Sequence, residues 1–107
     1  MALAKEKIIE FGDALYDAMR ARSTIAPLTE QAPEITIEDA YQVSLRMFER
    51  RTADGETMIG KKIGVTSKVV MDMLNVRQPD FGFLTNTMVY GNSAEVPASS
   101  TLIQPKA

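Results

Sequence analysis

Apolar residues recur with a helical period at the start of the chain and with a shorter, strand-like period further on. The first apolar series follows the spacing i, i+3, i+4, i+7, which is typical of one helix face. It consists of Ile8, Phe11, Gly12, Leu15, Ala18 and Met19. Charged residues fill the opposite positions, so the pattern predicts an amphipathic helix from about Ala4 to Ala21. The following stretch, "STIAPLTEQAPEI", contains two prolines and predicts an irregular loop.

A second helix is predicted over residues 36–53. Thr36 is a good N-cap, and Asp39 stands at the N3 position of a capping box. The stripe that we expect to be buried consists of Ile37, Tyr41, Ser44, Leu45 and Phe48. The basic run "RMFERR" is typical of a solvated helix end, and Gly55 is expected to end the element.

The period changes after Gly55. The stretch "TMIGKKIGV" predicts a strand, because it combines β-branched residues with two glycines that permit a close backbone approach. A short helix is predicted over residues 66–75, capped by Thr66 or Ser67, with an inward face made of Val69, Val70, Met73 and Leu74. Further on, the sequence predicts a turn at "RQPDFG", a short strand at "FLTNTMVY", a loop at "GNSAEVPASS" and the start of another strand at "TLIQP". Helices followed by short strands indicate an α+β fold.

Composition narrows the chemistry that the chain could perform. Its 107 residues have the length of one small domain, and a net charge of -2 gives no basic excess for binding nucleic acid. The absence of Cys and His removes thiolate chemistry and the commonest general base, so acid–base work would fall to Lys, Asp, Glu or Tyr. No apolar run is long enough to span a membrane, and "MALAKEKIIEFGD" is charged too early for a signal peptide. We therefore expect a cytoplasmic protein.

The stretch "GETMIGKK" is close to the phosphate-binding pattern G-x-x-x-x-G-K-[ST]. It has Lys62 where the pattern requires Ser or Thr, so the hydroxyl that would hold magnesium is missing. A phosphate-binding loop also leads from a strand into a helix, whereas this stretch leads from a helix into a strand. The pattern therefore argues against a nucleotide site.

Lys61 and Lys62 raise a different possibility. Alternation along the predicted strand places them on opposite faces. One lysine can then be solvated while the other points inward, and an inward lysine needs an anion to offset its burial. Such a lysine is a candidate for binding a carboxylate or for acid–base catalysis. The alternative is an edge strand with both lysines in water.

The segment "EDAYQVSLRMFERRTADGETMIGKKIGVTSKVVMDMLNVRQPDFGFLTNTMVY" resembles the 2-hydroxypenta-2,4-dienoate hydratases, also called 2-oxopent-4-enoate hydratases. These lyases belong to the hydratase/decarboxylase branch of the fumarylacetoacetase superfamily. The most specific pieces are "GKKIGVTSK" and "QPDFG", in that order and with a short helix between them. The resemblance runs from "LYDAM" to "LIQPKA" and implies that residues 1–107 are the N-terminal portion of a fumarylacetoacetase-like mixed β fold.

The resemblance implies an activity and a site. Members of this family hydrate 2-hydroxypenta-2,4-dienoate to 4-hydroxy-2-oxopentanoate in the meta-cleavage catabolism of aromatic compounds, with Mg²⁺ or Mn²⁺ holding the substrate. The family lysine falls on Lys62 and the family acid on Asp80, which would be catalytic, while Lys62, Val65 and Phe81 would contact the substrate. From the residues alone, Asp80 could simply cap its turn, Lys62 could be structural and Phe81 could belong to a core.

The family's metal ligands are glutamates that lie beyond Ala107. The resemblance therefore implies no metal site in this chain, a catalytic body outside it and an inactive isolated chain. The whole enzyme would act on a small 2-oxo acid, form a homo-oligomer and associate with 4-oxalocrotonate decarboxylase. That decarboxylase shares these motifs and is the alternative activity. A non-catalytic interaction module is an alternative of another class, because two amphipathic helices and seven methionines could form a partner surface, unless the methionines pack in a core.

Overall fold

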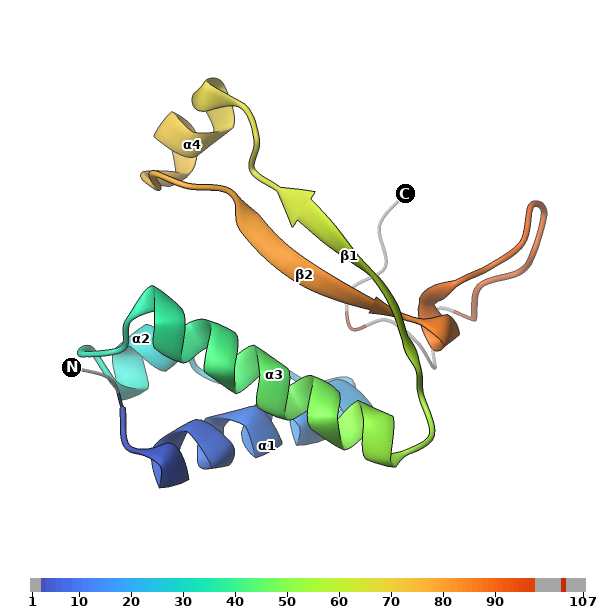
Figure 1. Cartoon of the computed structure of the whole chain (residues 1–107), viewed down its shortest axis with the longest axis horizontal. Helices are drawn as coiled ribbons and strands as arrows, with labels where there is room; N and C mark the ends of the chain where they lie inside the picture. Colours follow the sequence, from blue (N-terminus) through green and yellow to red (C-terminus); the bar gives the residue numbers. More distant parts are fainter. Residues whose placement is uncertain (1–2, 98–102, 104–107) are drawn as a thin grey trace. The chain divides into compact units, whose positions relative to one another are not determined.

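The computed structural model describes residues 3–97 and 103 (Figure 1). The chain divides into two compact units, one formed by Met1–Gly55 with Tyr90–Ala107 and the other by Glu56–Val89. We call the first the helical unit and the second the hairpin unit. Helices together with a two-stranded antiparallel sheet confirm the predicted α+β class. The strand predicted at "TLIQP" lies outside the described residues except for Ile103, and no described helix is long and apolar enough to cross a membrane.

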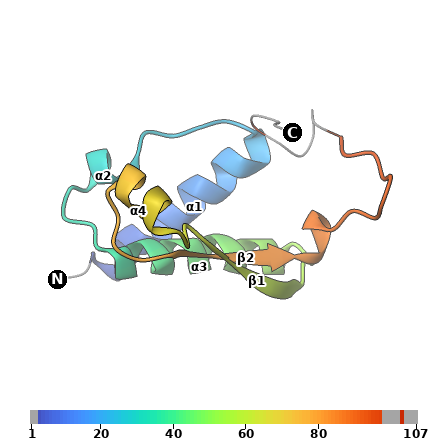
Figure 2. The same cartoon turned by 90° about the horizontal axis from the view of Figure 1, so that it is seen from above.

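Two long helices form the helical unit and lie side by side (Figures 1 and 2). They are α1 (Lys5–Ala21) and α3 (Ile37–Ala53), whose bounds differ from the predicted ones by a single residue at the start. The intervening segment contains a short helix, α2 (Leu28–Gln31), so the prediction of an irregular loop is wrong there. The fixed φ of Pro27 suits the start of a helix, and its carbonyl oxygen accepts hydrogen bonds from the first turn.

The core of the helical unit draws on all three of its helices and on the segments beside them. Its buried members are Leu3, Phe11, Ala32 and Val43, and partly buried Ile8, Leu15, Leu28 and Ile35 pack against them. The predicted stripe on α1 is therefore largely correct. The predicted stripe on α3 is correct at Phe48, which is buried, but wrong at Ile37, which is 57% exposed, and at Leu45, which is also exposed.

The burial of Asp39 against Leu3 explains why α3 turns a different face inward. The Asp39 carboxylate is buried and accepts hydrogen bonds from the backbone N–H groups of Thr36 and Leu3, each at 3.1 Å. Asp39 donates its own N–H to the Thr36 hydroxyl, which completes the predicted box. Ile37 precedes Asp39 by two residues and lies about 200° away around the helix, so it faces outward.

Helices α1 and α3 approach closely at Gly12. A Cβ atom at this position would overlap the side-chain stem of Arg46 and would lie 3.1 Å from the carbonyl oxygen of Val43. Glycine is therefore required at this point for the helices to pack.

The basic run at the end of α3 is not a solvated helix end. The Asp13 carboxylate of α1 accepts hydrogen bonds from Arg46 Nε and Arg50 Nη1, each at 2.9 Å. Arg51 is buried, and its Nη1 lies 2.8 Å from the sulfur of Met19. The prediction of a solvated helix end is wrong because the Asp13 carboxylate and the Met19 sulfur of α1 face these arginines. These partners lie on another helix, so the sequence of α3 by itself does not reveal them.

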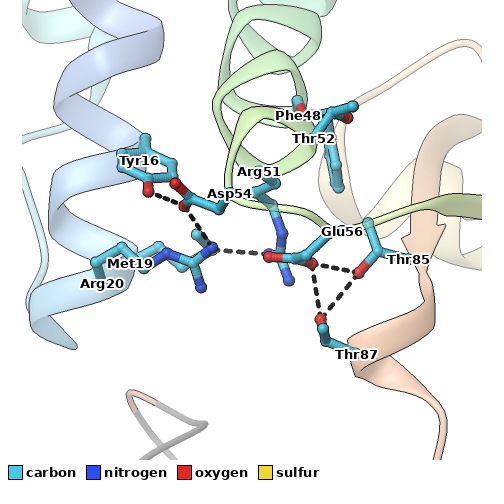
Figure 3. A network of polar contacts seen from close by, with 10 residues as sticks. All are labelled: Tyr16, Met19, Arg20, Phe48, Arg51, Thr52, Asp54, Glu56, Thr85 and Thr87. Carbon is cyan, nitrogen blue, oxygen red and sulfur yellow. Dashed lines mark hydrogen bonds and ion pairs between the residues drawn. The ribbon is translucent and has the colours of Figure 1, made fainter.

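A second polar cluster joins the ends of α1 and α3 (Figure 3). The Tyr16 hydroxyl donates a hydrogen bond to Asp54, and Arg20 Nη2 donates to the same carboxylate oxygen at 3.0 Å. The guanidinium of Arg50 lies 4.3 Å from the centroid of the Tyr16 ring, within the range of a cation–π contact. The Tyr16 and Arg20 hydrogen bonds hold the pKa of Asp54 below its ordinary value.

The hairpin unit contains strands β1 (Met58–Gly64) and β2 (Asp80–Thr85), helix α4 (Lys68–Leu74) between them, and a 3₁₀ turn, η1 (Asn86–Met88). The predicted turn at "RQPDFG" must be corrected, because Asp80 is already the first residue of β2. The strand predicted at "FLTNTMVY" accordingly begins earlier and ends at Thr85. Residues 91–97 contain no helix or strand, in agreement with the predicted loop.

Helix α4 begins two residues later and ends one residue earlier than the predicted range 66–75, and Ser67 is the cap of the two that were predicted. The Ser67 hydroxyl accepts a hydrogen bond from the N–H of Val70 at 3.2 Å. Its predicted inward face is wrong within the hairpin unit. The four residues concerned, Val69, Val70, Met73 and Leu74, are all exposed. One two-stranded sheet and one short helix supply no apolar layer broad enough to cover them.

The ion pairs of Asp13 make the helical unit sensitive to acid. Hydrogen bonds from Arg46 and then Arg50 hold the pKa of Asp13 below its ordinary value. A lowered folded-state pKa stabilises the protein above the unfolded pKa of about 4, and this stabilisation is lost as the pH falls through the folded pKa. We expect Asp13→Asn to lower the urea midpoint, followed by helical circular dichroism, at pH 7, and this deficit to shrink at about pH 3.

Asp17→Asn is the matched control, because Asp17 is an exposed acidic residue of the same helix. It should leave the midpoint nearly unchanged at both pH values. A deficit for Asp13→Asn that is as large at pH 3 as at pH 7 would contradict the ion-pair account.

Candidate active site

The register of the hairpin brings both motif residues to one face of the sheet. Lys62 pairs with Gly82, and Gly64 pairs with Asp80, across the antiparallel strands. Directly paired residues share a face, and so do residues two apart in one strand. We call the face formed by Lys62, Gly64, Asp80 and Gly82 the lysine face.

Lys61 lies on the opposite face. It pairs with Phe83, and the next residue of that face, Ile63, pairs with Phe81. The two lysines therefore point to opposite sides, as strand alternation predicts. The prediction that Lys62 and Phe81 share a substrate site has no support in this register, because they occupy opposite faces. Phe81 is also 55% exposed, so its alternative interpretation as a core residue is wrong within the hairpin unit.

The side chain of Lys62 runs along the lysine face over the two glycines. A Cβ atom at position 82 would lie 3.2 Å from Lys62 Cγ and 3.4 Å from its Cδ. A Cβ atom at position 64 would lie 2.8 Å from Lys62 Nζ. The stem thus crosses Gly82, and the ammonium group ends beside Gly64, whose partner across the hairpin is Asp80.

Lys62 and Asp80 share a face without forming an ion pair. The ion pairs among the described residues do not include either side chain, and both residues are exposed. An ammonium group and a carboxylate are therefore carried on the same exposed face of the hairpin. This arrangement can bind an anionic group through Lys62 while Asp80 accepts a proton or a hydrogen bond.

Val65 follows β1 directly and has an unusual backbone conformation. Its φ is 56°, in the left-handed region that β-branched residues rarely occupy. Such a conformation costs about 1–3 kcal/mol and is concentrated at functional sites. Val65 turns the chain from the end of the lysine face toward α4, which supports the prediction that it belongs to the site.

A third polar group, which the sequence did not reveal, closes the open end of the hairpin (Figure 3). Glu56 is only 7% exposed, and its Oε1 accepts hydrogen bonds from the hydroxyls of Thr85 at 2.6 Å and Thr87 at 2.7 Å. Beside it, the Thr57 N–H donates to Asn86 Oδ1 at 2.9 Å, and the Asn86 N–H donates to the Thr57 carbonyl oxygen at 3.0 Å. The only sign of this cluster in the local sequence was a pair of threonines separated by one residue, a pattern that is too common to be diagnostic.

The register changes once, next to this closure. Met58 pairs with Thr85, but the next pair is Gly60 with Leu84, so Ile59 is an extra residue in β1. This is the geometry of a β-bulge. Because every later residue of β1 is displaced by one position, the bulge determines which of the two lysines opposes Gly82.

The described residues do not fit a divalent cation. Magnesium prefers near-octahedral coordination by oxygen, often from carboxylates. No group of three acidic side chains comes together within the described part of the chain. Asp80 could bind such an ion only if the other ligands came from outside the described residues.

A groove of about 570 Å³ lies in the helical unit and is lined by residues of α1 and α3 together with Leu3. Its charged lining residues, Lys5, Arg46 and Glu49, include neither motif residue. Arg46 is already engaged by Asp13 and Glu49. The lysine face therefore remains the better candidate for chemistry.

No family model matches the chain, but individual known proteins do. The chain is 58% identical over 103 residues to a 2-hydroxypent-2,4-dienoate hydratase of Pseudomonas putida, a match that covers 96% of this chain and 46% of that protein. It is 57% identical over 104 residues to a 2-hydroxyhexa-2,4-dienoate hydratase of Comamonas testosteroni, covering 96% of this chain and 39% of that protein. The chain thus spans less than half the length of these curated relatives.

The fold also matches a solved structure. It superposes with a TM-score of 0.76 and 30% identity on 4-oxalocrotonate decarboxylase from Pseudomonas putida G7, complexed with magnesium and adipate, over 80% of this chain and 33% of that chain. The same values hold for that enzyme complexed with calcium and acetate. The predicted likeness to the hydratase/decarboxylase fold is therefore confirmed.

The Glu56 closure should hold the hairpin shut. Thr85→Val removes one hydroxyl from a buried carboxylate while keeping the side-chain shape, a change that typically costs about 1–3 kcal/mol. Because about 1.4 kcal/mol corresponds to a tenfold change in an equilibrium constant, we expect the Asn86 amide to exchange about tenfold or more faster in nuclear magnetic resonance measurements.

Thr57→Val is the control. Thr57 is exposed and takes part in the closure through its backbone, so this substitution should change the exchange rate little. Equal rates in Thr85→Val and the parent chain would show that the closure does not hold the hairpin.

Proposed function

We propose that this chain, which is homologous over 96% of its length to part of the 2-hydroxydienoate hydratases, contributes the lysine face to an enzyme of that activity. The reaction would be the hydration of 2-hydroxypenta-2,4-dienoate to 4-hydroxy-2-oxopentanoate in the meta-cleavage catabolism of aromatic compounds. The observation that carries the proposal is the 58% identity to a hydratase of this name, against 30% to the decarboxylase.

The substrate explains why a cation is needed. The carboxylate of a 2-hydroxydienoate is an anion, and direct addition of water to the far double bond would leave a carbanion without stabilisation. Ketonisation first gives a 2-oxo-3-enoate, whose C4 accepts water while negative charge develops on the 2-oxo oxygen. A fixed positive charge beside that oxygen stabilises the transition state more than the ground state, and it therefore lowers the barrier. Lys62 carries such a charge at the end of its path across the lysine face.

Asp80 could serve the reaction in either of two ways. It can orient the Lys62 ammonium, or it can move a proton during ketonisation or hydration. Its pairing with Gly64, beside which the ammonium ends, supports both roles. Val65 would shape the end of the same site through its unusual backbone.

The remaining machinery would come from outside the described residues. A divalent cation, magnesium or manganese, would polarise the carboxylate and 2-oxo groups when bound. The magnesium and calcium complexes of the homologous decarboxylase support a divalent ion, while the present residues supply no complete ligand set. A metal site and the rest of the catalytic body are therefore part of the proposal for the whole enzyme, as are its homo-oligomeric state and its association with the decarboxylase.

A chimera tests the function directly. In it, this chain replaces the matching segment of the Pseudomonas putida hydratase, and conversion of 2-hydroxypenta-2,4-dienoate is assayed. We expect hydration, and we expect Lys62→Ala to lower turnover about a hundredfold or more, because removing one stabiliser of developing charge typically costs about 3 kcal/mol. Lys62→Arg should also fail, because the guanidinium is larger and stays protonated.

Lys61→Ala is the matched control and should cost little, because Lys61 lies on the opposite face. Asp80→Asn should have an intermediate effect if Asp80 orients Lys62, and combining it with Lys62→Ala should add little. All variants must keep the parent's thermal stability. Equal losses for Lys61→Ala and Lys62→Ala would contradict the assignment. Decarboxylation of 4-oxalocrotonate in place of hydration would favour the sister activity, and no activity of either kind would favour an interaction module.

A further inference from the structure

The geometry points to Gly64 and Gly82 as positioning residues that determine where the Lys62 ammonium group lies. The effect of this position on catalysis rests on the proposed function. Both glycines share the lysine face with Lys62. Apart from chain neighbours, a Cβ atom at either position would meet the Lys62 side chain and no other group of the described residues within 4 Å. The space that the missing side chains leave is therefore the space that Lys62 occupies.

This path is unusual for a lysine in a strand. Strand side chains generally stand roughly perpendicular to the sheet, which would carry an exposed ammonium group away into water. Lys62 instead lies along the sheet, with its stem beside Gly82 and its Nζ beside Gly64. The ammonium group thereby lies over Gly64, the residue that pairs with Asp80 across the hairpin.

Backbone conformation does not require glycine at either position. Among the described residues, the glycine with positive φ is Gly55, so alanine is compatible with the backbone at both 64 and 82. Glycine also weakens a strand relative to alanine, because it loses more freedom on folding and packs no side chain. A purely structural view thus predicts that alanine at these positions is neutral or stabilising.

The two substitutions should move Lys62 in different ways. An alanine methyl group at 82 would press on Cγ and Cδ and lift the stem. A methyl group at 64 would come within 2.8 Å of Nζ, the flexible end of the side chain, and would displace the ammonium group while leaving the strand intact. Gly60 provides a control on the same strand and face. Among the described residues other than its chain neighbours, a Cβ there would meet only Leu84 Cδ1, at 4.0 Å.

The experiment uses the chimera with Gly64→Ala, Gly82→Ala and Gly60→Ala. The position of the ammonium group is probed by the acetylation rate of Lys62 relative to Lys61 in the same molecule, measured by mass spectrometry, and turnover is separated into kcat and KM. We expect Gly64→Ala and Gly82→Ala to raise the Lys62-to-Lys61 labelling ratio and to lower kcat/KM about tenfold to a hundredfold, since a small misplacement can have that effect. Gly60→Ala should change neither quantity, and thermal stability should not fall.

The two readouts separate this inference from the proposed function. A changed labelling ratio in an inactive chimera would sustain the positioning of Lys62 while rejecting hydratase activity. Unchanged labelling in Gly64→Ala and Gly82→Ala would overturn the inference. Equal kinetic losses in all three variants, or a changed labelling ratio with full activity, would also overturn it, because the position of the ammonium group would then be irrelevant to the reaction.

Discussion

The register between β1 and β2 is the constraint on which the candidate site depends. Before the bulge, Met58 opposes Thr85, and if that register continued, Lys61 would oppose Gly82. The single extra residue, Ile59, shifts the pairing by one, so that Lys62 opposes Gly82 instead. Because side chains alternate between faces, one residue of slippage exchanges the two lysines. The bulge thereby selects which ammonium group shares a face with Asp80.

Two features stabilise the register that places Lys62 opposite Gly82. The buried Glu56 carboxylate ties the start of the hairpin unit to Thr85 and Thr87, next to the bulge, and so opposes slippage of β1 along β2. At the other end of the strand, the glycines at 64 and 82 leave room for the chosen lysine to lie flat. A bulky residue at either position would oppose the selected register.

Local signals predicted the parts of the fold that depend on local physics. The Thr36–Asp39 capping box and the Ser67 cap are made by residues a few positions apart, so both could be predicted from the sequence. The buried face of α3 could not, because the inward turn of Asp39 depends on Leu3, thirty-six residues away. The arginines of α3 were assigned to solvent for the same reason, since their partner Asp13 lies on another helix.

The candidate site shows the same division. The motif resemblance singled out Lys62 and Asp80, and alternation separated Lys62 from Lys61. The sequence could not show that Lys62 and Asp80 share a face, since this follows from pairing between two strands and from a bulge with no local signature. The resemblance also implied that both Lys62 and Phe81 contact the substrate, and the sequence could not show that the register places these two residues on opposite faces of the sheet.

The most direct test of the account is a nuclear Overhauser measurement on the hairpin unit within the complete chain. If Lys62 lies across Gly82, the Hα protons of Gly82 will show strong cross-peaks to the Hγ and Hδ protons of Lys62 and none to those of Lys61. Short proton–proton distances are expected because a Cβ atom at position 82 would lie 3.2 Å from Lys62 Cγ and 3.4 Å from Lys62 Cδ. Cross-peaks from Gly82 to the side chain of Lys61 would contradict the account, because they would show that the strands pair without the shift at Ile59.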